Sequence, residues 1–151
     1  MSDDTVNFVW KDISTSWNKD KGFISTAASG ASVLMGKDKT GGPGLNPMEM
    51  LLAGLAGCTM MDVVDILRKK KQEPQEFKTI VRGKQQKDEY PRRFTEFQIE
   101  YIFTGENLIE KDIEQAIRLS EEKYCSVGGT LSKSGPVSST YRIEKIRIAI
   151  K

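Results

Sequence analysis

Two thiols are the side chains of this sequence with the clearest capacity for chemistry. Cys58 and Cys125 are the only cysteines among 151 residues, and the chain has no histidine. Without histidine, the Ser/His/Asp and Cys/His nucleophile pairs lack their base, and the usual zinc sites lack ligands. No segment has the alternating acidic residues of a calcium-binding loop. Thiol chemistry is therefore the leading candidate for a reactive centre, and we expect no metal and no cofactor.

A long helix must position the first thiol. Asn46 suits an N-cap, Pro47 suits the first helical position, and the side chain of Glu49 can reach back to the cap amide. The pattern predicts a helix from Pro47 to about residue 70, with Cys58 at its middle. Apolar residues cover nearly every side of this helix, which is typical of a buried helix.

Burying such a helix on all sides requires more surface than one small chain offers. A helix of 24 residues is about 36 Å long, and the six short strands predicted for this chain would leave part of it uncovered. We therefore expect an obligate homodimer with an intimate interface. Burial within a single sheet wrapped around the helix is the alternative.

The remaining segments predict an α+β fold with the order βββ-α-ββ-α-β, in one domain spanning residues 1–151. After the predicted second helix, Ser126 is a candidate cap for a short further helix, which would place Cys125 beside its N-terminus. In chain order we expect a three-stranded meander from the runs 6–13 and 22–35, a glycine-rich loop over 36–47, the long helix, antiparallel strands over 77–86 and 94–104, an amphipathic helix from about residue 108, and a strand over 140–150.

Composition limits the partners and the compartment. A formal net charge of +2 gives no reason to expect nucleic acid. The first ten residues carry acidic side chains where a signal peptide carries basic ones, and we expect no membrane association. The protein is therefore predicted to be cytoplasmic, where a cysteine pair is reduced and either inert or redox-active.

Four segments together carry a resemblance to a known family. They are the glycine-rich loop, NPMEMLLAGLAGC at residues 46–58, YPRRFTEFQIEY at residues 90–101, and EKYCSV at residues 122–127. The combination resembles the OsmC/Ohr family, the osmotically inducible and organic hydroperoxide resistance proteins, over nearly the whole chain. The resemblance implies an intertwined α+β homodimer with thiol-dependent peroxidase activity. Cys58 would match the peroxidatic cysteine and Cys125 the resolving cysteine.

This sequence departs from the family pattern at the groups that activate the thiol. Family enzymes use an arginine from the N-terminal region and a glutamate directly after the Asn-Pro pair. Here no arginine precedes Arg68, Met48 occupies the glutamate position, and Glu49 is displaced by one residue. Glu49 precedes Cys58 by nine residues, which places it on the opposite face of a regular helix. Without a nearby cation, we expect Cys58 to react slowly.

Other charged residues are candidates to replace the missing groups. Arg92 and Arg93 fall in the predicted hairpin, where ordinary solvation is the alternative interpretation. Asp62 and Asp65 lie near the same helix face as Cys58, where a carboxylate opposes thiol ionisation. We expect them to pair with the basic helix end, for example Asp65 with Arg68. Lysines of the N-terminal half are further candidates for the cation: Lys11, Lys37 and Lys39.

Two functions are consistent with these patterns. In the first, Cys58 reduces an organic hydroperoxide, becomes a sulfenic acid and forms a disulfide with Cys125, which an external thiol or dithiol reduces in an oxidative stress response. In the second, a catalytically weak member of the family uses the same pocket to bind a hydrophobic small molecule or partner. The distance between the two cysteines distinguishes the two-cysteine cycle from other uses of the fold.

Overall fold

The computed structural model describes residues 6–36, 38 and 41–146. The chain forms two compact units, residues 1–50 and residues 51–151. The sequence predicts a single domain over residues 1–151, and this stays a prediction. The α+β class and the predicted order of strands and helices are confirmed, and the short further helix considered near Ser126 is present before the last strand.

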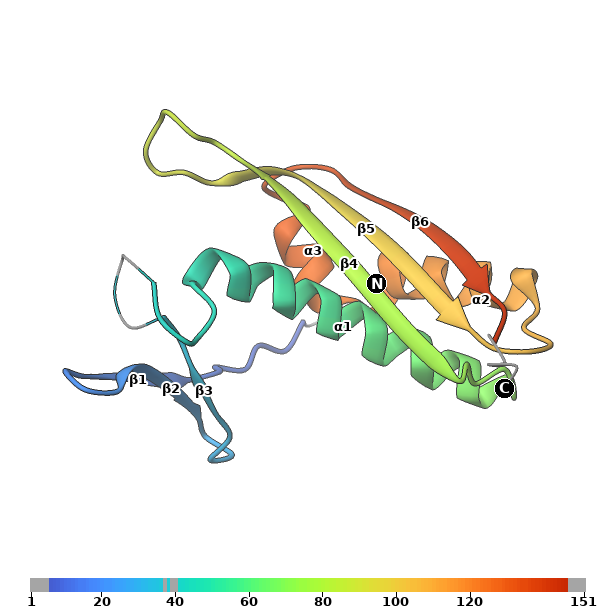
Figure 1. Ribbon diagram of the computed structural model, residues 1–151, viewed down its shortest axis with the longest axis horizontal. Coiled ribbons are helices and arrows are strands. Elements are labelled where there is room, and N and C mark those ends of the chain that lie inside the picture. The colour runs from blue at the N-terminus through green and yellow to red at the C-terminus, as the bar shows by residue number, and fades with distance from the viewer. Residues whose placement is uncertain (1–5, 37, 39–40, 147–151) are drawn as a thin grey trace, which may run out of the picture. The chain divides into compact units, whose positions relative to one another are not determined.

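The first unit holds the predicted three-stranded meander (Figure 1). The side chain of Asn18 closes its first turn by accepting hydrogen bonds from the backbone amides of Asp20 and Lys21. The prediction of a strand over residues 6–13 is wrong, because pairing with the second strand ends at Ile13. The strands, which pair in antiparallel fashion, are β1 (Ile13–Asn18), β2 (Gly22–Ala27) and β3 (Ser32–Leu34).

The long helix α1 (Pro47–Lys69) begins and ends close to the predicted residues. Its N-terminus is a reciprocal capping box, in which the backbone amide of Asn46 donates to Glu49 Oε2 and the Glu49 amide donates to Asn46 Oδ1, both at 2.9 Å. After its C-terminus, Lys71 adopts a positive φ of 57° and the Gln72 amide reaches back to a helix carbonyl. Local chemistry therefore determines both helix ends.

The second unit contains a sheet with the order β4-β5-β6. The predicted hairpin is confirmed, with β4 and β5 antiparallel, whereas β5 and β6 are parallel. Parallel neighbours need a long crossover, and two helices and a π-helical turn make it. The second-unit elements are β4 (Glu76–Gln85), β5 (Phe94–Thr104), α2 (Glu110–Leu119), the π turn η1 (Ser120–Tyr124), α3 (Ser126–Leu131) and β6 (Val137–Glu144).

The boundaries of β6 correct one prediction. The last strand begins at Val137, three residues before the predicted start, and ends at Glu144. Residues 147–150 of the predicted strand lie outside the described residues. Pairing with β5 explains the early start, since Val137 lies opposite Phe97 in the parallel register.

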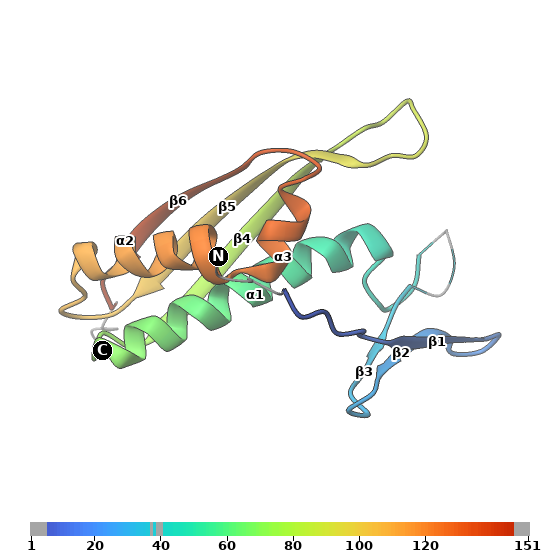
Figure 2. The same ribbon diagram turned by 180° about the vertical axis from the view of Figure 1, so that it is seen from behind.

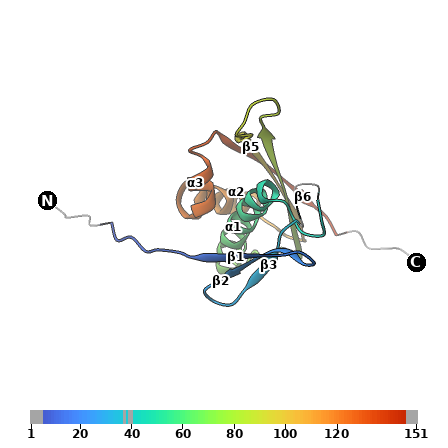
Figure 3. The same ribbon diagram turned by 90° about the vertical axis from the view of Figure 1, so that its left-hand side faces the viewer.

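Helices α1, α2 and α3 cover one face of the β4-β5-β6 sheet, as opposite views show (Figures 1 and 2). Seen from the side, sheet and helices of this unit form two layers (Figure 3). The central strand β5 supplies alternating buried side chains to the core between them. The core includes Phe97, Ile99, Tyr101 and Phe103 from β5, Leu55, Val63 and Leu67 from α1, and Ile113, Ala116 and Ile117 from α2.

Within one chain, α1 is buried along a single face. Its buried residues are spaced by four: Leu55, Thr59, Val63 and Leu67. Elsewhere on the helix, Met61 is 76% exposed and Leu51 is 42% exposed. Within the described residues of the second unit, α1 is therefore covered along one face only. By length and composition α1 also passes the test for a membrane-crossing helix, which core helices pass as well.

Candidate functional site

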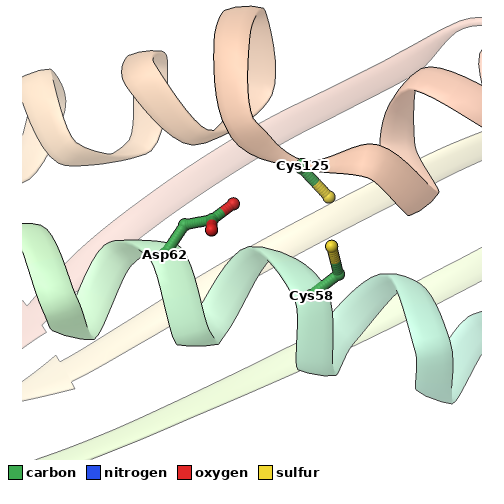
Figure 4. A group of neighbouring side chains, drawn as sticks. All are labelled: Cys58, Asp62 and Cys125. Atoms are coloured by element: carbon green, nitrogen blue, oxygen red, sulfur yellow. The ribbon is translucent and has the colours of Figure 1, made fainter. Parts of the chain in front are cut away.

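The two cysteines come together in the second unit. Cys58 is on α1, and Cys125 follows η1 at the start of α3. Their sulfur atoms and a carboxylate oxygen of Asp62 all lie within 4.8 Å of one another, with the three side chains pointing toward a common centre (Figure 4). Both cysteines are free thiols. The structure therefore brings together the two residues that the sequence predicts as a redox pair.

The local structure around Cys125 differs from the prediction. Cys125 itself is the N-cap of α3, and its sulfur accepts a hydrogen bond from the Gly128 amide at 3.2 Å. Ser126, the predicted cap, is the first residue of the helix. The π turn explains this placement, because the Cys125 amide donates to the carbonyl of Ser120 at 2.8 Å and the chain leaves the helical path there.

A pocket of about 190 Å³ opens beside Cys125. It is smaller than the roughly 300–1,000 Å³ of sites for drug-sized ligands. Gly128 leaves space at the sulfur, since a Cβ there would lie 3.2 Å from Cys125 Sγ. The lining combines apolar and polar groups: Leu55, Thr59, Ile99, Glu121, Cys125, Gly128, Gly129, Ser132 and Val137.

The surroundings of Cys125 favour its protonated form. Burial is the largest influence and, together with the Cys58 thiol and the Asp62 carboxylate, it raises the pKa of Cys125 to about 11. The Gly128 amide acts in the opposite direction by donating to the sulfur. Among the described residues, none of these influences comes from a cation. Cys125 is therefore a thiol at neutral pH.

Asp62 has a different partner from the one predicted. Ser120 Oγ donates to Asp62 Oδ2 at 2.9 Å, beside the two sulfurs, so for Asp62 the expected pairing with the basic helix end is wrong. Asp65 does pair with the basic helix end, although with Lys69 at 2.7 Å and not with Arg68, the example given. The spacing explains the difference, because Asp62 lies one helical turn after Cys58 and on the side that faces η1.

Buried hydroxyl groups extend from Asp62 into the core. Thr59 Oγ1 lies 3.0 Å from Ser120 Oγ and 2.7 Å from Tyr101 Oη, and Tyr101 Oη donates to Glu121 Oε1 at 3.1 Å. Sequence reasoning missed Thr59, Tyr101, Ser120 and Glu121. A signal was present for Thr59, a polar residue within the most apolar helix. We name the five residues Asp62, Ser120, Thr59, Tyr101 and Glu121 the hydroxyl chain.

The predicted activating residues have local partners or exposed positions. Glu49 is held by the capping box. The Arg92 guanidinium lies 4.5 Å from the centroid of the Tyr90 ring, and Arg93 is exposed. Lys37 and Lys39 lie outside the described residues, and Lys11 is exposed in the first unit. Activation by any of these residues stays a prediction.

The same three groups are those that could hold a metal ion among the described residues. Cys58, Asp62 and Cys125 together offer two sulfurs and one oxygen. Structural zinc sites take four protein ligands, and catalytic sites take three with an open position. With three ligand atoms, these residues match the number of protein ligands in a catalytic zinc site. The prediction from the sequence is that no metal is used.

Comparisons with known proteins agree with the fold and show the family. Residues 36–140 match the protein-family model described as OsmC-like protein. Protein YhfA of Escherichia coli strain K12 is 34% identical over 127 residues, which cover 84% of this chain and 93% of YhfA. A hypothetical protein from Aquifex aeolicus VF5 is 31% identical with a TM-score of 0.78, and the match covers 93% of this chain and 100% of that chain.

More distant structures share the fold. An OsmC-like protein from Mycoplasma pneumoniae has a TM-score of 0.73 at 17% identity, covering 89% of this chain and 97% of that chain. An organic hydroperoxide resistance protein from Legionella pneumophila has a TM-score of 0.61 at 11% identity, covering 90% and 98%. The family resemblance of the sequence is thus confirmed, and the chain belongs to the OsmC-like family.

Proposed function

We propose that the protein is a thiol-dependent peroxidase that reduces organic hydroperoxides in an oxidative stress response. The observation that carries this proposal is the position of two free thiols within 4.8 Å of each other, one of which, Cys125, lines a pocket. A disulfide requires sulfurs about 2.05 Å apart, so a small movement of the two side chains would join them. The pocket volume suits a short organic group.

The reaction divides into three steps. The Cys58 sulfur attacks the terminal oxygen of the hydroperoxide, an S–O bond forms, the O–O bond breaks, and the alcohol leaves. Cys125 then attacks the sulfenic sulfur, a disulfide forms, and water leaves with the Cys125 proton. An external thiol or dithiol reduces this disulfide and returns a proton to each cysteine.

Peroxide consumption by reduced protein tests the proposal. We expect turnover of cumene hydroperoxide or t-butyl hydroperoxide with a dithiol, and its loss in Cys58→Ser. The matched variant Cys125→Ser should accumulate a Cys58 sulfenic acid that a dimedone-type reagent traps. Equal turnover in the wild-type protein and in Cys58→Ser would rule out the peroxidase.

The exposed apolar residues of α1 support a further part of the proposal, an intertwined homodimer. Met61 and Leu51 are exposed apolar side chains on a helix whose buried residues among those described lie along a single face. Sedimentation should give twice the mass of one chain, and Met61→Lys should weaken the association. A monomer at micromolar concentration would contradict this part. A cytoplasmic location, as composition predicts, would keep the thiols reduced.

One observation favours a second function. No arginine precedes Arg68 and Met48 occupies the family glutamate position, whereas a peroxidase normally needs such groups to form the thiolate of its attacking cysteine. A catalytically weak protein could use the pocket to bind a hydrophobic small molecule. In that case the wild type and Cys58→Ser would show the same low turnover and would bind an apolar fluorescent probe equally, whereas the peroxidase predicts a difference in turnover.

A further inference from the structure

The hydroxyl chain joins two regions of the proposed peroxidase site. At one end, Asp62 lies within 4.8 Å of the sulfurs of Cys58 and Cys125. At the other end, Glu121 lines the pocket beside Cys125. The side chains between the two ends lie in the core, where Ser120 and Tyr101 are 0% exposed and Thr59 is 1% exposed. The middle of the chain is thus almost inaccessible to bulk solvent, although Thr59 also lines the pocket.

Counting hydrogens shows what the chain can carry. Its five groups make four oxygen–oxygen contacts: Asp62 to Ser120, Ser120 to Thr59, Thr59 to Tyr101, and Tyr101 to Glu121. The three hydroxyl groups supply one hydrogen each. With both carboxylates ionised, one of the four contacts therefore lacks a hydrogen. A single added proton completes all four hydrogen bonds.

The added proton can reside at either end. When it is on Asp62, each group donates toward Glu121, and when it is on Glu121, each group donates toward Asp62. Moving the proton from one end to the other reverses every hydrogen bond and breaks none. Burial raises the pKa of Tyr101, which keeps its phenol protonated as such a carrier must be.

No charged group of the described residues neutralises Asp62 by an ion pair. The residues that share a surface cavity with it include Asp65, Lys69, Lys70 and Tyr124. Lys69 pairs with Asp65 and Lys70 pairs with Asp112 at 3.2 Å. The thiols of Cys58 and Cys125 are titratable side chains within 4.8 Å of an Asp62 carboxylate oxygen.

From this arrangement we infer that Asp62 accepts the thiol proton of Cys58 and that the hydroxyl chain delivers a proton through Glu121 to the alkoxide leaving the hydroperoxide. The inference rests on the proposed peroxidase function. Asp62 thereby supplies the base that histidine provides in other thiol enzymes, and Ser120, Thr59 and Tyr101 are positioning residues. The gap between Asp62 and Cys58 is of a size that commonly closes when substrate binds.

The atoms balance without any further reactant. Cys58 loses one proton to Asp62, and its sulfur takes the terminal OH of the hydroperoxide as the O–O bond breaks. The remaining alkoxide takes one proton from Glu121, and the chain shifts one proton from Asp62 to Glu121. The sum is one thiol and one hydroperoxide converted to one sulfenic acid and one alcohol.

Leaving groups of different basicity test the inference. An alkoxide needs a proton as it leaves, whereas the acetate released from peracetic acid does not. We therefore expect Glu121→Gln to slow single-turnover sulfenic acid formation with t-butyl hydroperoxide by about 100-fold, in the range of general acid catalysis, and to leave the rate with peracetic acid unchanged. Tyr101→Phe should show the same selective loss, because it interrupts the chain between its ends.

The neighbouring variant Glu122→Gln is the matched control, since Glu122 is exposed in the same π turn. It should leave both rates unchanged. Equal rates of Glu121→Gln and wild type with t-butyl hydroperoxide, or an equal loss with both oxidants, would overturn the proton route and leave the peroxidase intact. A wild-type protein that forms no sulfenic acid with either oxidant would instead overturn the peroxidase itself, and the proton route with it.

A measurement without peroxide tests the role of Asp62. In a Cys125→Ser background, iodoacetamide reports the reactivity of Cys58 alone. If Asp62 accepts the proton, Asp62→Asn should slow this alkylation at neutral pH. If Asp62 only opposes the thiolate by its charge, the same variant should accelerate alkylation, and that result would overturn the inference.

Discussion

The two faces of α1 differ sharply although both are largely apolar. One face, with Leu55, Thr59, Val63 and Leu67, is buried in the core, whereas Met61 on another side is 76% exposed. Cys58 and Asp62 lie between these extremes and are half-buried. The difference shows that the apolar composition of α1 makes either face suitable for burial. Packing against the sheet and the crossover decides which face is buried in the core. Cys58 and Asp62 therefore lie between the buried and the exposed face, where they contact the core and remain partly accessible to solvent.

The largest expected effect separates the two faces directly. Leu67→Ala should lower the free energy of unfolding by about 2–5 kcal/mol, because it leaves a cavity at a fully buried position. Met61→Ala should cost less than about 1 kcal/mol in the single chain. Urea unfolding at several protein concentrations measures both. A Met61→Ala loss that depends on concentration would point to association, and equal, concentration-independent losses would contradict the comparison.

The burial of Cys125 should be visible in how its rate of alkylation depends on pH. Because the pKa of Cys125 is raised to about 11, its thiolate fraction at pH 7 is on the order of one in ten thousand. In Cys58→Ser the contribution of Cys58 is lost but burial remains, so alkylation of Cys125 should still accelerate about tenfold per pH unit beyond the pH of about 8–9 at which an exposed thiol levels off. A plateau near pH 8 or 9, as for an exposed thiol, would mean that burial does not control this cysteine.

A smaller effect is expected for the polar position of the buried face. Thr59→Val should cost about 0.5–1.5 kcal/mol, the net contribution of a hydrogen bond, because Tyr101 and Ser120 keep Glu121 and Asp62 as partners. Thr59→Ser keeps the hydroxyl and serves as the control for its hydrogen bonds. Chemical denaturation distinguishes the two, and a stabilised Thr59→Val would show that the hydroxyl contacts do not support the core.

The smallest effect concerns the helix end, remote from both faces. Glu49→Ala removes one exposed bond of the capping box and should cost about 0.5 kcal/mol. Because this side chain is bound to the Asn46 amide, we expect peroxide turnover to stay unchanged. Thermal unfolding and the dithiol-coupled assay measure the two quantities. A loss of turnover beyond the loss of folded protein would assign Glu49 an activating role.

Sequence patterns predicted the elements whose signals are local. The capping residues located the start of α1, and alternation located β4 and β5 to within a residue. The pattern failed at residues 6–12, where β-branched and aromatic residues occur but the partner strand has ended. It failed again at Ser126, because the π turn that makes Cys125 the cap leaves no clear sequence signature.

The two thiols of the candidate site were predicted from the sequence, whereas the hydrogen-bonded hydroxyl groups beside them were missed. Cys58 and Cys125 were predicted as a pair, and they lie within 4.8 Å. Asp62 was noticed for its spacing from Cys58 but assigned to the wrong partner. The spacing of charges on one helix favours pairs along that helix, whereas its actual partner, Ser120, lies 58 residues away on another element.

The sequence by itself determined a capped helix around Cys58, a hairpin of alternating strands and the identity of the family, because each depends on residues close together in the chain or on a recognisable motif. Only the tertiary structure decided which face of α1 is buried and which hydroxyls meet. Thr59 contacts Tyr101 and Ser120 across 42 and 61 residues. Such contacts depend on how the crossover packs against the sheet, since packing and not spacing brings these polar groups within hydrogen-bond distance.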